Sequence, residues 1–171
     1  MLFFLSGFTA LVYQVLWMKE LGLLFGNTIH AAATTLSSFF LGLMSGSYFF
    51  GRIIRRYRNA VQVYSLLEFG IALSALLYFL LLAVFHAIYD SVFGLFGAAA
   101  GGLVVIKFFM AVLLLTPAAF FMGGTFPVMS HYLVRNKYQQ GIITSALYAT
   151  NTLGAMTGAF LAGFYLPVLL G

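Results

Sequence analysis

Long apolar stretches alternate with short polar segments along this chain. Five stretches are long enough to cross the hydrocarbon core of a bilayer, which takes about 20 apolar residues. They cover about residues 2–25, 28–51, 61–86, 103–134 and 141–166. The pattern predicts an all-α, polytopic bundle of about five spanning helices, forming a single transmembrane domain over residues 1–171. Segment 87–102, with Asp90 and the run GAAAGG, is expected to be too broken to span and to lie at the membrane surface.

Two of the apolar stretches repeat each other at an offset of 112 residues. LGLMSGSYFFG at 41–51 corresponds to LGAMTGAFLAG at 153–163. Glycines at helical spacing let two backbones approach closely in a membrane. A duplicated helix of this kind is typical of transporters, although small residues are common in any transmembrane helix. The glycines that we expect to pack helices are Gly42, Gly46, Gly51, Gly154, Gly158 and Gly163.

Composition excludes several classes of function. The chain is 63% hydrophobic and 6% charged, whereas a soluble domain carries about 25% charged residues. The sequence therefore belongs to an integral membrane protein. It contains no cysteine, which rules out disulfides, thiolate catalysis and Cys-based metal sites. Its three scattered histidines and three carboxylates give no ligand spacing, so we expect no metal and no cofactor.

Six of the eight Lys and Arg residues lie in two loops between apolar stretches, at 52–60 and 135–140. This placement argues against nucleic-acid binding and sets the topology: both loops, and with them the N-terminus, are expected to be cytoplasmic. The two glycine segments then cross the membrane in opposite directions, as in an inverted repeat. Such a repeat would contain six helices, so the sequence predicts an incomplete six-helix half of a major facilitator-type fold. The lipid-contacting and topology-setting residues are Arg52, Arg55, Arg56, Arg58, Arg135 and Lys137.

Five sequence blocks, in one order, carry a family resemblance. They are SGFTALVYQVLWMKELGLLFGNT (6–28), FFLGLMSGSYFFGR (39–52), YSLLEFGIALSAL (64–76), LLLTPAAFFMGGTFPVM (113–129) and ALYATNTLGAMTGAFLAGFYLPVLLG (146–171). Together they resemble the membrane domain of the spermidine synthase-like family, described as fused major facilitator/spermidine synthase proteins. The resemblance implies a bacterial inner-membrane module, often followed by a cytosolic S-adenosylmethionine-binding domain. The chain has no GxGxG motif after a strand, so aminopropyl transfer is not assigned to these residues.

The segment GSYFFGRIIRRYR (46–58) resembles the Gly- and Arg-rich loop between the second and third helices of major facilitator transporters. In those transporters an acidic residue pairs with the arginines and helps to latch one conformation. Ile54 or Arg55 occupies the corresponding place here. We therefore expect this loop to set topology and to bind anionic lipid rather than to form a latch.

Polar residues within the apolar stretches are the candidates for a solute site. Glu68 would suit a proton or a cationic amine, or alternatively a salt bridge or hydrogen bond that fixes helix packing. Tyr13, Gln14, Asn151 and Thr152 would converge with Glu68 on a cavity, or simply hydrogen-bond one helix to another.

Two prolines mark the fourth apolar stretch, which is too long for one straight crossing. Pro117 and Pro127 each remove a backbone donor. A helix broken near the middle of the membrane points to a transporter site, whereas an ordinary proline kink is the alternative. We include both prolines among the candidate solute-binding residues.

Three functions remain open from the sequence. The first is a non-catalytic, transporter-like half-bundle that binds a small cationic solute. The second is a structural or assembly subunit of a larger membrane complex. The third is a membrane anchor for an S-adenosylmethionine-type enzyme domain that these residues do not contain. The expected partners are the lipid bilayer and other transmembrane helices or subunits, in a homo- or hetero-oligomer; no enzymatic activity is expected.

Overall fold

The computed structural model describes residues 1–26, 29–96, 100–134 and 137–166. Five α-helices make up almost all of this part of the chain, and it contains no strand. The all-helical fold predicted from the sequence is therefore confirmed. The helices are α1 (Leu2–Phe25), α2 (Ile29–Ile53), α3 (Ala60–Phe96), α4 (Ala100–Leu133) and α5 (Gln140–Phe160). Short 3-10 turns, η1 (Ile54–Arg56) and η2 (Lys137–Gln139), follow α2 and precede α5, and a π-helical turn, η3 (Leu161–Tyr165), continues α5.

Among the described residues, three helices are long and apolar enough to cross a membrane. These segments are Leu2–Leu23, Ala60–Val84 and Val105–Leu133, and they are consistent with an integral membrane protein. The other two helices, α2 and α5, do not meet the same criterion. Both carry several serines, threonines and glycines, which lower their hydropathy.

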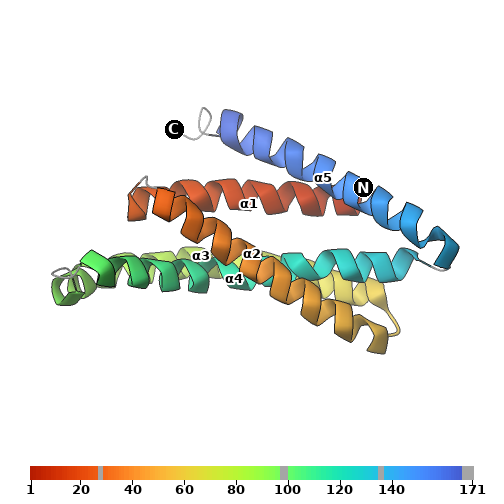
Figure 1. Cartoon of the computed structure of the whole chain (residues 1–171), viewed down its shortest axis with the longest axis horizontal. Coiled ribbons are helices and arrows are strands. Elements are labelled where there is room, and N and C mark those ends of the chain that lie inside the picture. The colour runs from red at the N-terminus through yellow and green to blue at the C-terminus, as the bar shows by residue number, and fades with distance from the viewer. Residues whose placement is uncertain (27–28, 97–99, 135–136, 167–171) are drawn as a thin grey trace.

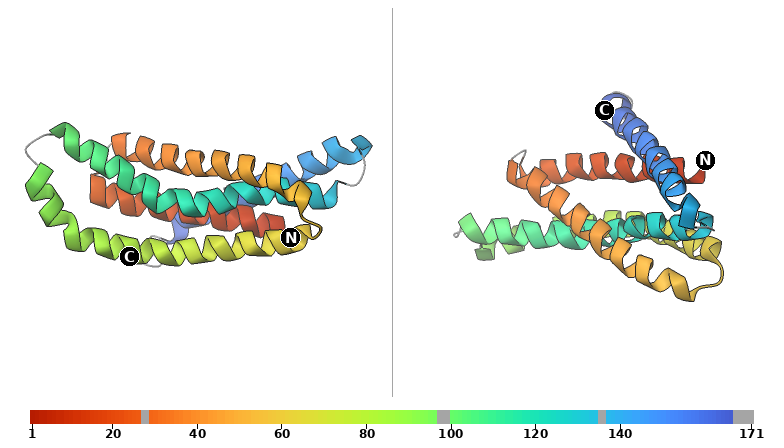
Figure 2. Two further views of the ribbon diagram at one scale, coloured as in Figure 1. Left: turned by 90° about the horizontal axis from the view of Figure 1, so that it is seen from below. Right: turned by 45° about the vertical axis from the view of Figure 1, so that its right-hand side comes forward.

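The helices lie roughly lengthwise beside one another, with α2 and α5 crossing their neighbours at an angle (Figure 1). The pairs in most extensive contact are α2 with α4, α1 with α5, and α3 with α4. Helices α2 and α5 run in opposite directions, as do α1 and α4 (Figure 1). The connection from α2 to α3 and the start of α5 lie at the same end of the bundle as Met1 (Figures 1 and 2).

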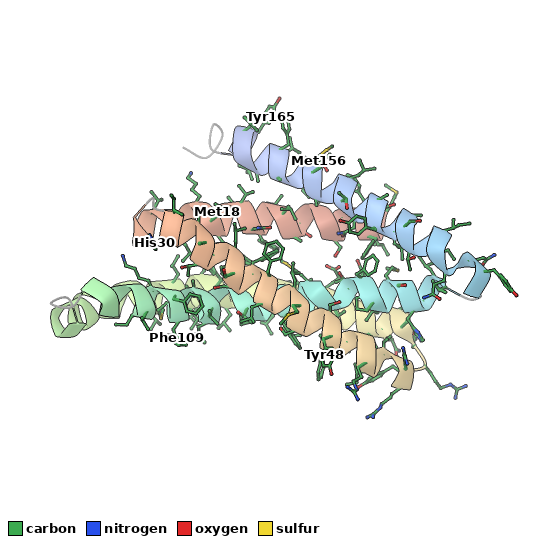
Figure 3. All side chains as sticks on the ribbon, viewed as in Figure 1. Met18, His30, Tyr48, Phe109, Met156 and Tyr165 are labelled. Carbon is green, nitrogen blue, oxygen red and sulfur yellow. The ribbon has the colours of Figure 1, made fainter. Side chains whose placement is uncertain are left out.

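Buried apolar side chains form two clusters. One joins α1, α2, α3 and α4 around Trp17, Phe39, Tyr78 and Leu115. The other lies towards the Met1 end, around Phe3, Leu67 and Val128, and also includes η1 and α5. Large apolar side chains also project outward from the bundle, as Met18, Tyr48, Phe109, Met156 and Tyr165 show (Figure 3). This outward apolar surface is what a bilayer requires.

The structure corrects one local expectation, the break in the fourth apolar stretch, and adds detail to another. Helix α3 continues through Phe96, although its apolar segment of membrane-spanning length is Ala60–Val84, close to the expected 61–86, because Asp90 alone does not interrupt a run of helix-compatible apolar residues. Helix α4 likewise passes through Pro117 and Pro127 without a break. A proline in a membrane helix removes one backbone bond, and contacts with neighbouring helices keep the rest of the helix in place.

Candidate functional site

Glycines hold α2 against α4. A Cβ atom on Gly42 would meet Ala119 and the carbonyl oxygen of Thr116, and a Cβ on Gly46 would collide with the carbonyl oxygen of Phe120. The absence of side chains at these two positions therefore lets the helix backbones touch.

A second pair of glycines holds α5 against α1 in the same register. Cβ atoms on Gly154 and Gly158 would collide with the carbonyl oxygens of Phe4 and Phe8. Gly154 and Gly158 lie 112 residues after Gly42 and Gly46. Phe4 and Phe8, which they meet, lie 112 residues before Thr116 and Phe120, which Gly42 and Gly46 meet. The contact of α2 with α4 is thus reproduced by the contact of α5 with α1.

Hydroxyl hydrogen bonds follow the same correspondence. Ser45 Oγ donates to the carbonyl oxygens of Leu41 and Gly42, at 2.8 and 3.0 Å. Thr157 Oγ1 donates to those of Leu153 and Gly154, at 2.9 and 2.8 Å. The repeat seen in the sequence is therefore a repeat of contacts as well as of residue types.

The last glycine of each segment does not take part in a close contact. A Cβ on Gly51 would lie 3.6 Å from the Cβ of Pro127, which is an ordinary van der Waals distance. A Cβ on Gly163 would meet nothing within 4 Å. Close helix packing thus rests on the first two glycines of each segment.

A cavity of about 380 Å³ lies between the two glycine-packed helix pairs. We call it the axial cavity. Residues 112 positions apart line it together in three cases: Ala10 with Met122, Leu11 with Gly123, and Phe39 with Asn151. The cavity therefore lies where the two halves of the repeat meet. Its volume falls within the range of about 300–1,000 Å³ that is usual for small-molecule sites.

Neutral polar side chains supply the chemistry of the axial cavity. They are the hydroxyls of Ser6, Ser47, Thr125 and Tyr148 and the side-chain amide of Asn151. Thr125 Oγ1 donates to the carbonyl oxygen of Met122 at 2.7 Å, so its lone pairs remain able to accept a hydrogen bond. The lining offers both donors and acceptors in an otherwise apolar wall.

Glu68 on α3 is connected to the axial cavity through Tyr64. The hydroxyl of Tyr64 lies close to the side chains of Glu68 and Ser6, and Ser6 lines the cavity. Glu68 Oε1 is buried and has no hydrogen-bond partner among the described residues. A buried carboxylate oxygen without a partner costs free energy unless a proton or a cation neutralises it. The three residues thus extend the site from α1 into α3.

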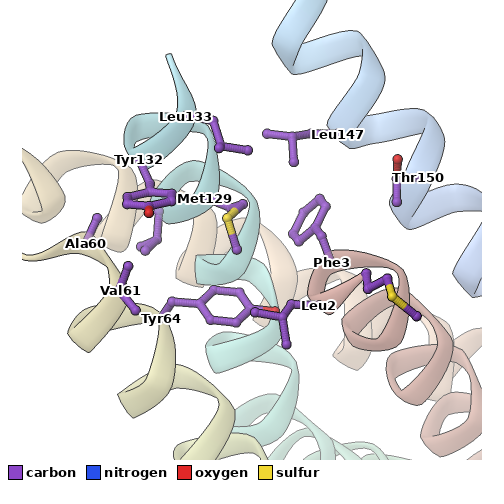
Figure 4. A pocket seen from close by; sticks show the side chains of 12 residues that line it. Leu2, Phe3, Ala60, Val61, Tyr64, Met129, Tyr132, Leu133, Leu147 and Thr150 are labelled. Carbon is purple, nitrogen blue, oxygen red and sulfur yellow. The ribbon is translucent and has the colours of Figure 1, made fainter. Parts of the chain in front are cut away.

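A second cavity, of about 480 Å³, lies at the Met1 end of the bundle and is seen from close by in Figure 4. We call it the end cavity. Side chains from α1, α3, α4 and α5 enclose it, including Phe3, Val61, Met129 and Leu147 (Figure 4). Its wall is mostly apolar, and Tyr64 lines it as well. Tyr64 and Ser6 therefore lie between the two cavities.

The predicted site residues fall into different places. Asn151 lines the axial cavity and Glu68 reaches it through Tyr64 and Ser6, whereas Thr152 is exposed. Tyr13 stacks on Trp17, with ring centroids 5.4 Å apart. The remaining predicted residues, Gln14, Pro117 and Pro127, line neither the axial nor the end cavity.

The sequence interpretation missed Ser6, Tyr64, Ser47, Thr125 and Tyr148. One signal was available for Tyr64, because it precedes Glu68 by four residues and so shares its helix face. Ser6 immediately precedes Gly7, where a Cβ would collide with the backbone of Asn151. That proximity depends on how α1 meets α5, which a single helix pattern does not reveal.

The described arginines of the first basic loop are exposed. Arg52 Nη1 donates to the hydroxyl of Tyr48 at 2.9 Å, and Arg55, Arg56 and Arg58 lie on or just after η1. Arg135 lies outside the described residues, and for Lys137 only the backbone, at the start of η2, is described. Among the described residues, no group of three or more His, Asp or Glu side chains is arranged to hold a metal ion.

Comparisons with protein-family models, with curated proteins and with solved structures found no match to this chain. The function therefore has to be argued from the geometry of the site.

Proposed function

We propose that this chain is a non-catalytic, transporter-like half-bundle whose axial cavity binds a small cationic solute. One observation carries the proposal: residues 112 positions apart line this cavity together from both halves of the repeat. In transporters built from inverted repeats, substrate sites lie at the interface between the repeats. A cavity in that position is the expected place for a solute.

The repeat is proposed to be inverted. Helices α2 and α5 run in opposite directions (Figure 1) and make corresponding glycine contacts with α4 and α1. Under this proposal α1 corresponds to α4 and α2 to α5, and all five helices cross the bilayer. The clustered arginines would place the Met1 end in the cytoplasm.

A positive charge on the solute is the second element of the proposal. The lining of the axial cavity is neutral, and Glu68 is the carboxylate connected to it through Tyr64 and Ser6. A cationic amine near Ser6 would be stabilised by Glu68 in surroundings where water screens charge weakly.

A matched pair of solutes tests this proposal. The purified protein in lipid nanodiscs is titrated with a four-carbon diamine and with the four-carbon diol of the same length. We expect the diamine to bind and the diol to bind at least about ten-fold more weakly, because only the diamine gains an interaction of about 1.4 kcal/mol or more with the carboxylate. Equal binding of both compounds would show that the positive charge of the solute does not contribute to binding.

Two variants locate the binding site. Asn151→Ala should weaken diamine binding because it removes a polar group from the cavity wall. Thr152→Ala changes the next residue, which is exposed, and should leave binding unchanged. If both variants bind the diamine as the parent protein does, the axial cavity is not the site.

An assembly subunit is the second candidate function. Gly163 faces open space within the chain, so it could receive a helix of a partner subunit. However, Gly42, Gly46, Gly154 and Gly158 already pack against α4 and α1. These four glycines would therefore not be available for docking, which makes this candidate the weaker of the two. No feature of the described residues favours an anchoring role for a separate enzyme domain.

A further inference from the structure

The end cavity has a wall that suits a hydrocarbon chain. Three hydroxyls, those of Tyr64, Tyr132 and Thr150, are the polar side-chain groups among its lining residues, and no charged side chain is among them. Thr150 Oγ1 donates to the carbonyl oxygen of Ala146 in its own helix at 2.8 Å. A cavity of about 480 Å³ with this lining gains free energy by burying apolar surface rather than by binding a polar solute.

This cavity is continuous with a groove between α4 and α5. The groove has a volume of about 240 Å³ and is lined by Leu133 of α4 and by Ile143, Ala146, Leu147 and Thr150 of α5. Leu133, Leu147 and Thr150 line the end cavity as well. Leu133 and Leu147 point toward each other across the space between the two helices (Figure 4). An acyl chain of the surrounding bilayer can therefore enter the end cavity sideways, between α4 and α5.

Arginines lie beside the wall of the end cavity. Ile54, in the turn η1, is 2% exposed and belongs to the same buried cluster as Ala60 and Tyr64, which line the cavity. Arg55 and Arg56 occupy the rest of this turn, and both side chains are exposed. The packing of η1 thus holds two guanidinium groups close to a cavity that has no charge of its own.

No carboxylate in the nearby sequence balances these arginines. The chain contains no Asp or Glu between Glu20 and Glu68, and none after Asp90. The end of α2, the start of α3 and the start of α5 therefore contribute basic side chains but no acidic ones to the Met1 end of the bundle. Guanidinium groups bind phosphate through paired, charge-assisted hydrogen bonds. An apolar cavity that opens toward lipid and has arginines beside it is complementary to an anion with a hydrocarbon chain.

We propose that the end cavity binds one anionic phospholipid, with an acyl chain in the cavity and the phosphate against Arg55 and Arg56. The sequence alone predicts that the basic loop binds anionic lipid, and the structure adds a place for the chain. A free phosphate ion would leave the cavity unused, and a lipid without net charge would leave the arginines unpaired. Neither Glu68 nor the axial cavity takes part, so this site does not depend on solute binding.

Three lipids test the two parts of the site separately. The purified protein, in a neutral detergent at low ionic strength, is titrated with each lipid, and bound lipid is counted by native mass spectrometry. The lipids are a phosphatidylglycerol with sixteen-carbon chains, a phosphatidylcholine with the same chains, and a phosphatidylglycerol with four-carbon chains. We expect one long-chain phosphatidylglycerol to bind at least about ten-fold more tightly than either of the others, because it alone uses both the arginines and the cavity.

Either of two results overturns the proposal. Equal binding of the phosphatidylcholine would show that the arginines do not select the headgroup. Equal binding of the short-chain lipid would show that the cavity does not hold the acyl chain.

Single charge removals locate the phosphate. At least one of Arg55→Gln and Arg56→Gln should weaken binding of long-chain phosphatidylglycerol about five-fold, because each basic residue near an anionic headgroup contributes to its attraction. Lys19→Gln is the matched control: it removes the same charge from an exposed position toward the other end of α1 and should change binding less than two-fold. If neither arginine variant differs from the Lys19 variant, the phosphate does not lie on η1 and the proposal is wrong.

A larger side chain at the opening locates the acyl chain. Leu133→Trp fills space shared by the groove and the end cavity, so the long-chain phosphatidylglycerol should lose most of its advantage over the short-chain form. Leu66→Trp adds the same bulk at a position on α3 that is 68% exposed and does not line the end cavity, and it should keep that advantage. Thermal unfolding without lipid verifies that both variants fold. A folded Leu133→Trp protein that still prefers long chains overturns the proposal, and if this variant does not fold, the chain-length comparison on the unaltered protein decides. None of these results bears on diamine binding in the axial cavity, so the two proposals fail separately.

Discussion

The α2–α4 pair and the α1–α5 pair share one glycine contact but differ in their surroundings. Helix α3 covers α4 along its length, so Leu114 and Val128 are buried. In α1, Leu2, which precedes Leu114 by the same 112 residues, is 65% exposed, and Leu16, the counterpart of Val128, is half-buried. The comparison shows that close backbone contact between two helices and burial of their outer faces contribute separately to the stability of the fold. A substitution in the contact itself should damage both pairs, whereas a substitution on the outer face should damage only the covered pair.

The largest effect is expected from Gly46→Leu. Even a Cβ at this position collides with the backbone of Phe120, and a backbone cannot move aside as a flexible side chain can. Overpacking costs typically 1–3 kcal/mol and sometimes more, and we expect a loss of about 3 kcal/mol in the free energy of unfolding. Thermal or denaturant unfolding in detergent micelles measures it.

Gly158→Leu is the matched change in the other pair and should cost less, because α5 can move away from α1 with little effect on the rest of the bundle. Gly163→Ala is the control, since its Cβ would meet nothing within 4 Å. Equal losses for Gly46→Leu and Gly158→Leu would show that both pairs are held equally firmly.

The second comparison removes corresponding leucines from α4 and α1. Leu114→Ala leaves a cavity beside Leu115 and Ala118 in the buried cluster, and such truncations cost about 2–5 kcal/mol. Leu2→Ala removes a side chain that is 65% exposed, and the change should stay within about 0.5 kcal/mol. Unfolding of both variants in the same detergent measures the difference. A large loss for Leu2→Ala would mean that Leu2 is covered in the folded protein.

A smaller effect is expected at Tyr64, which joins α3 to α1 through Glu68 and Ser6. Tyr64→Phe removes the hydroxyl that lies beside Glu68 and Ser6 and keeps the ring, so the loss should be about 1–2 kcal/mol. Ser65→Ala is the control, because its hydroxyl donates only to the carbonyl oxygen of Val61 in its own helix. Comparable losses for the two variants would show that the hydroxyl of Tyr64 does not help to join the helices.

The smallest effects are expected at the hydroxyls beside the glycines. Ser45→Ala and Thr157→Ala each remove hydrogen bonds to carbonyl oxygens of the same helix. These carbonyls keep their backbone partners, so each variant should lie within about 0.5 kcal/mol of the parent protein. A loss above about 1 kcal/mol in only one variant would indicate that the two pairs differ at the contact itself.

The sequence predicts much of the architecture because apolar length and glycine spacing are local properties. The five helices and the two glycine segments could all be recognised in this way. The sequence does not reveal which helix each glycine packs against, because the contacting residues, such as Gly46 and Phe120, lie far apart in the chain. The continuity of α3 past Asp90 and of α4 through the two prolines was not predicted for a different reason: Asp90 and the prolines weaken a helix locally, whereas neighbouring turns and packing maintain it.

The candidate site was predictable only in part. An intramembrane carboxylate is unusual enough to draw attention to Glu68, and Asn151 lies near the glycines of α5. Serine and threonine are too common in membrane helices for Ser6 or Thr125 to be recognised from composition. Ser6 and Thr125 line the same cavity because α1 and α4 both border it. The sequence repeat does not reveal this arrangement until the contacts between the helices are known.

The hydroxyl groups of α2 and α5 bear on the cost of placing these helices in apolar surroundings. Thr35, Ser38, Ser45, Ser145, Thr150 and Thr157 all donate to carbonyl oxygens of their own helix. A hydroxyl that is bonded within its helix exposes no free donor to lipid, so each residue costs less to insert than its hydropathy value implies. Hydrogen bonding within the helix therefore makes α2 and α5 less costly to place in apolar surroundings than their serines and threonines alone would indicate.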